Sequence, residues 1–136
     1  MIILQHATTL EIEPAHVGHD VDIAIDRDRI AAIGTGLAAQ YPDATCHDMT
    51  GLTVMPGLVC SHNHFYSALA RGITTPIQPS TDFVQVLQHL WWRLDKAIDR
   101  DILTASAIVG AMEAIRSGVT TVVDHHASPS FISGSL

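Results

Sequence analysis

The first 55 residues carry an apolar–polar alternation that predicts β-strands. Between residues 20 and 27, every second side chain is a branched apolar one, namely Val21, Ile23 and Ile25. This two-residue period is typical of a strand with one buried face. A polar segment, Asp26–Arg29, then leads into a second apolar run at residues 30–33, which ends at Gly34. The pattern predicts a β-hairpin.

The pattern changes at Leu52. Residues 52–55 and 58–60 are apolar without alternation, which is typical of a strand buried on both faces of a parallel sheet. Pro56 and Gly57 interrupt this run. We therefore predict a boundary here, with a β-rich part over residues 1–55 and a second architecture over residues 56–136.

Two apolar stripes at helical spacing follow. The first helix is predicted to be capped by Ser80 or Thr81, and the second begins at the cap Asp99 and ends at Gly118. The first stripe comprises Phe83, Leu87, Leu90, Leu94 and Ile98, and the second comprises Ile102, Ala105, Val109, Met112 and Ile115. A β-branched run at residues 119–123 predicts another buried strand. The order strand, helices, strand is that of a right-handed βαβ unit in a parallel α/β sheet.

Composition narrows the class of protein. The net charge is −7, from 14 acidic and 7 basic residues, which argues against a nucleic-acid partner or an anionic membrane surface. The apolar fraction of 47% is enough for a sizeable core. Two cysteines without a CxxC motif favour the reducing cytoplasm. The first residues lack the features of a signal peptide, and no apolar run is long enough to span a bilayer.

His62 and His64 are the strongest candidates for chemistry. They follow the apolar run at 58–60 and are separated by one residue, so they lie on the same side of a strand. Two imidazoles at the end of a parallel strand can bind one metal ion, with zinc as the first choice and iron as the second. A catalytic site needs about one more protein ligand and an open position for water. The alternative is a pair of polar residues at a strand end.

Asp124, His125 and His126 follow the second predicted strand. Because adjacent strand residues face opposite sides, only one of these histidines can share the side of His62. Asp124 could orient a ligand histidine, but a helix cap or a polar loop cluster is the more common arrangement.

Cys60 and Arg71 have less specific patterns. In a regular strand Cys60 shares the side of His62 and could be a thiolate ligand, although a buried structural cysteine is commoner. Arg71 lies in the loop after the histidines, where it could contact an anionic or carbonyl group of a substrate. A solvated loop arginine is the commoner case, and both roles stay open.

Three segments resemble the amidohydrolase superfamily. Residues 48–64 resemble the passage from a small β-sandwich through a Pro-Gly turn into a first barrel strand bearing His-x-His, residues 22–34 resemble the sandwich hairpin, and residues 114–124 resemble the junction to barrel strand two. Residues 60–73, 90–98 and 122–136 are most similar to the SsnA-type aminohydrolases, relatives of guanine deaminase and of the chlorohydrolases.

The resemblance implies an α/β fold, with the N-terminal part of a β-sandwich at 1–55 and the first βα units of a (β/α)8 barrel at 56–136. It implies a hydrolase of non-peptide C–N bonds that deaminates a heterocyclic or amidine-type small molecule through a metal-activated hydroxide. His62 and His64 would be metal ligands, and the full-length enzyme would be a homo-oligomer.

Other activities remain open. A cyclic amidase or a chlorohydrolase of the same superfamily fits the same residues, as does a non-catalytic, truncated metal-binding product. A complete barrel takes about 250 residues, so we expect this chain to be an N-terminal fragment. The acid–base residues would then lie beyond Leu136, and the isolated chain would be inactive.

Overall fold

The computed structural model describes residues 1–73 and 76–135. They form two compact units, Met1–Pro56 and Gly57–Leu136. The first unit comprises β1 (Ile2–Ile12), β2 (Ala15–Asp26), β3 (Arg29–Gly34), α1 (Leu37–Gln40), β4 (Thr45–Asp48) and β5 (Thr53–Val54). These strands form one sheet in the order β3-β2-β1-β4, with β5 also paired to β1. The predicted hairpin is confirmed, because β2 and β3 are antiparallel and join through a tight turn between Asp26 and Arg29.

The core of the first unit lies between the sheet and α1. Ile3, Ala24 and Leu37 form a buried cluster. The predicted alternation along β2 is wrong in one respect, because Asp22 is buried beside Ile23 rather than exposed. Its carboxylate accepts backbone N–H bonds from His6 at 3.2 Å and Leu37 at 2.9 Å. A carboxylate paired in this way can be buried without a large cost in free energy.

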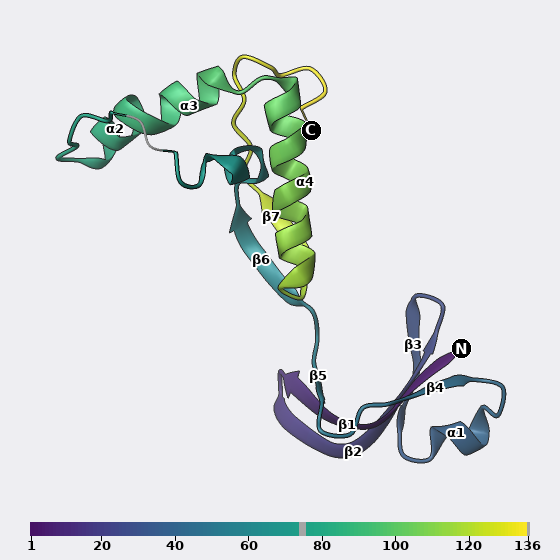
Figure 1. Ribbon diagram of the computed structural model, residues 1–136. Coiled ribbons are helices and arrows are strands. Elements are labelled where there is room, and N and C mark those ends of the chain that lie inside the picture. The colour runs from purple at the N-terminus through teal and green to yellow at the C-terminus, as the bar shows by residue number, and fades with distance from the viewer. Residues whose placement is uncertain (74–75, 136) are drawn as a thin grey trace. The chain divides into compact units, whose positions relative to one another are not determined.

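The second unit has the predicted βαβ order (Figure 1). Its elements are β6 (Leu58–Asn63), the 3₁₀-helix η1 (Phe65–Ala70), α2 (Phe83–Val86), the π-helical segment η2 (Leu87–Trp91), α3 (Trp92–Ala97), α4 (Arg100–Arg116) and β7 (Val119–Asp124). β6 and β7 pair in parallel. Figure 1 shows α4 running alongside both strands. The carboxyl ends of β6 and β7 therefore meet at one edge of this two-stranded sheet.

The helix ends are partly as predicted. Asp99 caps α4, since its Oδ1 accepts the N–H of Ile102 at 2.9 Å, and the chain leaves this helix at Gly118 with φ 76°. The prediction for the earlier helix is wrong: Asp82 is the cap, accepting the N–H of Gln85 at 2.9 Å, instead of Ser80 or Thr81. This helical stretch also widens into the π-helical segment η2 and is not one regular helix.

The predicted burial of the apolar runs is also wrong. In β6, Leu58 is 46% and Val59 65% exposed, and in α4 Ile115 is 72% exposed. The buried residues of α4 are Leu103 and Ser106. The physical reason is a lack of neighbours: among the described residues, β6 pairs only with β7, so most of its apolar surface has no layer to pack against.

The helices of the described residues are short, and the longest, α4, has 17 residues. None of these helices combines the length and the apolar character needed to cross a bilayer.

Candidate functional site

The carboxyl end of β6 brings two imidazoles together. Nε2 of His62 and Nε2 of His64 lie 3.0 Å apart, with their ring planes at 78°. The two side chains thus lie on the same side of the strand, as the spacing predicts. His62 is exposed and His64 is partly buried. Neither histidine is fully buried.

A backbone carbonyl sets the tautomer of His64. Nδ1 of His64 lies 2.7 Å from the carbonyl oxygen of His125. Because a carbonyl oxygen only accepts, Nδ1 must carry the proton and Nε2 must carry the lone pair. In the neutral pair, Nε2–H of His62 then donates to Nε2 of His64. A shift of the His62 proton to its Nδ1 would leave two lone pairs aimed at one point, which is the state that binds a metal ion.

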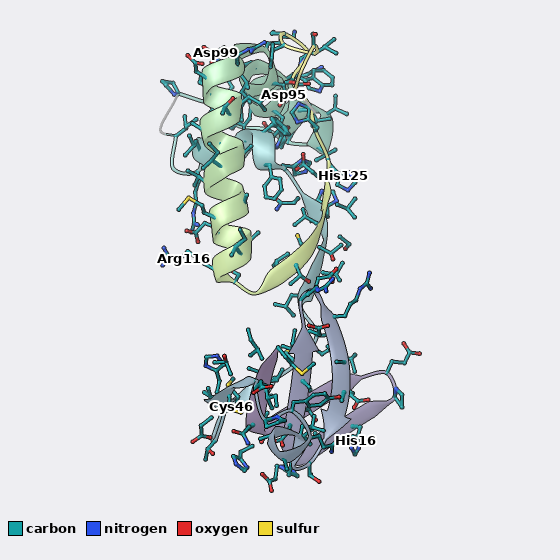
Figure 2. The ribbon with its side chains drawn as sticks, turned by 90° about the vertical axis from the view of Figure 1, so that its right-hand side faces the viewer. His16, Cys46, Asp95, Asp99, Arg116 and His125 are labelled. Atoms are coloured by element: carbon teal, nitrogen blue, oxygen red, sulfur yellow. The ribbon has the colours of Figure 1, made fainter. Side chains whose placement is uncertain are left out.

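Only one of the two adjacent histidines after β7 joins this pair, as predicted. The ring of His125 stacks on that of His62, with centroids 4.2 Å apart and planes at 22°. His125 is labelled at the end of β7 in Figure 2. His126 is engaged elsewhere. Because the hydroxyl of Ser128 donates to the carbonyl of Phe131 at 2.8 Å, Nε2 of His126 donates to that hydroxyl at 2.7 Å.

Asp124 has the commoner of its two anticipated roles. Its Oδ1 accepts the backbone N–H of Phe65 at 2.8 Å, which is the first N–H after His64. Its Oδ2 lies 3.9 Å from Nδ1 of His126. Asp124 thus holds the backbone that follows the histidine pair and makes no hydrogen bond to an imidazole of the pair.

Cys60 does not join the pair. Cys60 pairs with Val122 and Asn63 pairs with Asp124, so β6 has two residues between these pairs where β7 has one. The ladder is therefore irregular there, and the simple alternation is lost. The thiol donates to the carbonyl of His62 at 3.3 Å, and Cys60 lines a cavity with Val109 of α4. Cys60 is only partly buried, so it is not the buried structural cysteine that was the commoner expectation, and Arg71 is an exposed loop residue.

The histidine pair has no third metal-ligating side chain beside it among the described residues. Among residues 1–73 and 76–135, no set of three or more His, Cys, Asp or Glu side chains converges on one point. The donor chemistry of the pair still fits zinc. Bonds of 2.0–2.1 Å at a tetrahedral angle would place two nitrogens about 3.3 Å apart, and the observed 3.0 Å is a few tenths of an ångström shorter.

Tyr66 and Asp95 were missed by the sequence analysis. Tyr66 is 4% and Asp95 8% exposed, and the tyrosine hydroxyl donates to Oδ1 of Asp95 at 3.0 Å. Two features of the sequence could have pointed to these residues: Asp95 directly follows the apolar position Leu94, and Tyr66 lies two residues after His64. Burial, followed by the hydrogen bond to Asp95, raises the pKa of Tyr66 to about 12.

This raised pKa predicts a loss of stability at high pH. An unfolded tyrosine ionises near pH 10, whereas folded Tyr66 keeps its proton to about pH 12. Between these values the folded state binds more protons than the unfolded state, so the free energy of unfolding falls as pH rises. Urea unfolding at pH 9 and pH 11 should show this fall, and Tyr66→Phe should show a smaller one. An equal fall in both proteins would contradict the assignment.

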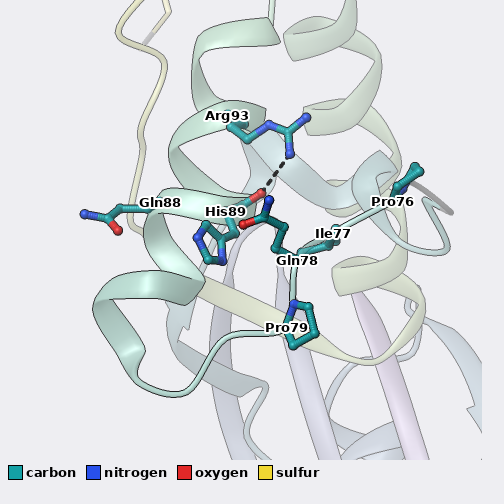
Figure 3. Close-up of a pocket in the computed structure, with 7 residues that line it drawn as sticks. All are labelled: Pro76, Ile77, Gln78, Pro79, Gln88, His89 and Arg93. Atoms are coloured by element: carbon teal, nitrogen blue, oxygen red, sulfur yellow. Dashed lines mark hydrogen bonds between the residues drawn. The ribbon is translucent and has the colours of Figure 1, made fainter.

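One cavity lies away from the histidine pair. It has a volume of about 650 Å³ and is lined by Pro76, Ile77, Gln78, Pro79, Gln88, His89 and Arg93. In Figure 3 the guanidinium of Arg93 donates to the carbonyl of His89, at 3.3 Å. No candidate residue from the sequence lines it.

Comparison with known proteins identifies the family. The profile of the amidohydrolase family matches residues 53–133, which is more than half of the chain. The chain belongs to the amidohydrolase family. This family match spans β6, η1, the helices and β7, and so includes both histidines. The predicted α/β class and the resemblance are thereby confirmed.

Several amidohydrolase relatives are deaminases by name. The chain is 33% identical over 98 residues to 8-oxoguanine deaminase of Pseudomonas aeruginosa, covering 71% of this chain and 21% of that protein. It is 32% identical over 125 residues to 5-methylthioadenosine/S-adenosylhomocysteine deaminase of Nitratidesulfovibrio vulgaris, covering 90% and 27%. The chain therefore spans about a fifth to a quarter of these relatives.

A solved structure extends the likeness to the fold. The zinc complex of the atrazine chlorohydrolase TrzN from Arthrobacter aurescens TC1 matches with a TM-score of 0.75 and 28% identity. The match covers 93% of this chain and 29% of TrzN. The chain thus has an α/β fold like that of TIM-barrel amidohydrolases and corresponds to a fragment of such a protein.

Proposed function

We propose that the protein containing this chain is a metal-dependent hydrolase of non-peptide C–N bonds that deaminates a heterocyclic or amidine-type small molecule. The observation that carries the proposal is the 3.0 Å approach of Nε2 of His62 to Nε2 of His64 at the carboxyl end of β6. Ligands bind at this end of the strands in barrel folds. The deaminase names of relatives that cover 71% and 90% of this chain support the reaction type.

His62 and His64 would hold a divalent ion, and zinc is our first choice because TrzN was solved with zinc. When bound, such an ion lowers the pKa of a water molecule and so supplies the nucleophile at neutral pH. The chain's own residues prepare the site: the carbonyl of His125 keeps the proton of His64 on Nδ1, and Asp124 anchors the backbone after His64. A third ligand and the acid–base groups would come from other parts of the protein.

A chlorohydrolase is the second candidate. The TrzN match, which covers 93% of this chain, supports it directly. The residues described here would serve both reactions, because both need an activated water and differ in the leaving group.

We further propose a cytoplasmic location for the protein, since Cys46 and Cys60 are free thiols. We also propose that the full-length protein is a homo-oligomer, and light scattering would test this.

The test is a substrate panel with the full-length protein. After loading with zinc, the protein is incubated with 8-oxoguanine, S-adenosylhomocysteine and atrazine, and released ammonia and chloride are measured separately. Ammonia release supports the deaminase, and chloride release supports the chlorohydrolase. If the protein holds stoichiometric zinc but releases neither ammonia nor chloride from any of the three compounds, the result would count against both the deaminase and the chlorohydrolase.

The isolated 136-residue chain is expected to be inactive in the same panel. Two imidazoles bind a metal ion weakly compared with a closed site of three or more ligands. Ammonia release from the purified chain, dependent on added zinc, would show that the residues described here suffice and would overturn this prediction.

A further inference from the structure

The ring of Tyr66 lies between histidines from the ends of both strands. Its centroid is 5.8 Å from that of His64 with the planes at 89°, and 5.5 Å from that of His126 with the planes at 68°. Such edge-to-face contacts are favourable and directional. Tyr66 belongs to η1, which begins directly after His64. A change in the tilt of the Tyr66 ring would therefore alter its edge contact with the imidazole of His64.

The hydroxyl of Tyr66 is tied to a different element. It donates to Oδ1 of Asp95 in α3 at 3.0 Å, and both residues are more than nine-tenths buried. Figure 2 labels Asp95 among the helices of this unit. A buried carboxylate is costly unless it is hydrogen-bonded. Leucine at position 95 and phenylalanine at position 66 would fill the same apolar cluster with Ile98 and Leu103, so packing alone does not require this polar pair.

His64 needs a second restraint. Its bond from Nδ1 to the carbonyl of His125 is a single hydrogen bond, and rotation of the ring about its side-chain torsions χ1 and χ2 would break it. Rotation moves Nε2 away from its meeting point with Nε2 of His62. The edge contact with Tyr66 opposes this rotation, and Asp95 holds Tyr66 in place.

We propose that Tyr66, anchored by Asp95, is a positioning residue that holds His64 in the orientation needed to share a metal ion with His62. The inference rests on the proposed function. In this arrangement, the buried hydrogen bond between Tyr66 and Asp95 connects α3, which lies between β6 and β7 in the sequence, to the pair His62 and His64. The metal affinity of the protein should therefore depend on a hydroxyl that does not touch the metal.

The test uses the full-length protein and four changes: Tyr66→Phe, Asp95→Ala, the two combined, and Asp95→Asn, which keeps an acceptor at Oδ1. The readouts are the zinc Kd by chelator competition, the visible spectrum after cobalt substitution, and the melting temperature of the metal-free protein. We expect Tyr66→Phe and Asp95→Ala each to raise the Kd about tenfold to a hundredfold. The combination should cost no more than either alone, and Asp95→Asn should stay near wild type.

Tyr41→Phe is the matched control, because Tyr41 lies in the first unit and packs against the cluster around Leu37. It should leave the Kd and the cobalt spectrum unchanged. An unchanged Kd and spectrum in Tyr66→Phe, even with a lowered melting temperature, would overturn the inference and leave a structural role only. Should Asp95→Ala not fold, Tyr66→Phe still decides, since it keeps the ring. A wild-type protein that binds no zinc would refute the proposed function itself, and the inference with it.

Discussion

Replacing His62 with alanine is expected to abolish tight metal binding and hydrolytic activity in the full-length protein. His62 supplies one of the two Nε2 atoms that meet at 3.0 Å. Removing a ligand should weaken binding by more than the roughly 10- to 100-fold seen when a supporting partner of a ligand is lost. Metal content per protein after dialysis, measured by elemental analysis, checks the prediction together with ammonia release.

His64→Ala should also abolish tight metal binding, and in addition it should lower the stability of the folded protein. Its Nδ1–H bond to the carbonyl of His125 links the ends of β6 and β7, whereas His62 makes no such bond to the backbone among the described residues. The melting temperature should therefore fall more for His64→Ala than for His62→Ala.

His16→Ala is the matched control, because His16 is an exposed histidine on β2 (Figure 2). It should retain metal, activity and stability. Stoichiometric metal in His62→Ala would refute the ligand assignment, and full activity without metal would refute the proposed class of reaction.

Gly57→Ala should destabilise the second unit by about 1–3 kcal/mol, which is the usual cost of overpacking. A Cβ at Gly57 would clash with Oγ1 and Cγ2 of Thr120 and would lie 2.7 Å from its Cβ. The last of these atoms is attached to the backbone of β7, so rotation of the threonine side chain cannot relieve the contact. The amino ends of β6 and β7 would have to separate. Urea unfolding followed by circular dichroism measures the change.

Gly34→Ala is the control for a generic effect of removing glycine. Its Cβ would meet only Cδ2 of Leu37, at 3.9 Å, which is ordinary van der Waals contact. This change should be neutral or slightly stabilising, because alanine restricts the unfolded chain. Adding Thr120→Ala to Gly57→Ala should recover part of the loss, since it removes Oγ1 and Cγ2. Equal stability of Gly57→Ala and wild type would contradict the close approach.

Local chemistry explains the parts of the fold that the sequence predicts well. The β2–β3 hairpin, the cap Asp99 and the end of α4 at Gly118 depend on near neighbours in the chain. The spacing of His62 and His64 predicts that they share one side of a strand, and this prediction needs only the strand period. These features need no knowledge of distant contacts.

Features that depend on distant segments could not be predicted. The extra residue in β6 between Cys60 and Asn63 changes which side Cys60 occupies, and only pairing with β7 reveals it. The burial predicted for Val59 and Ile115 assumed neighbouring layers that the described residues do not supply.

By itself, the sequence determined a βαβ segment with two imidazoles at the end of its first strand, because strand and helix periods are local properties. Only the tertiary structure decided what surrounds those imidazoles. His125 stacks on His62 from a strand about 60 residues later, its carbonyl sets the proton of His64, and Tyr66 meets Asp95 across 29 residues. Such contacts depend on how elements pack, and no pattern of spacing along the chain encodes them.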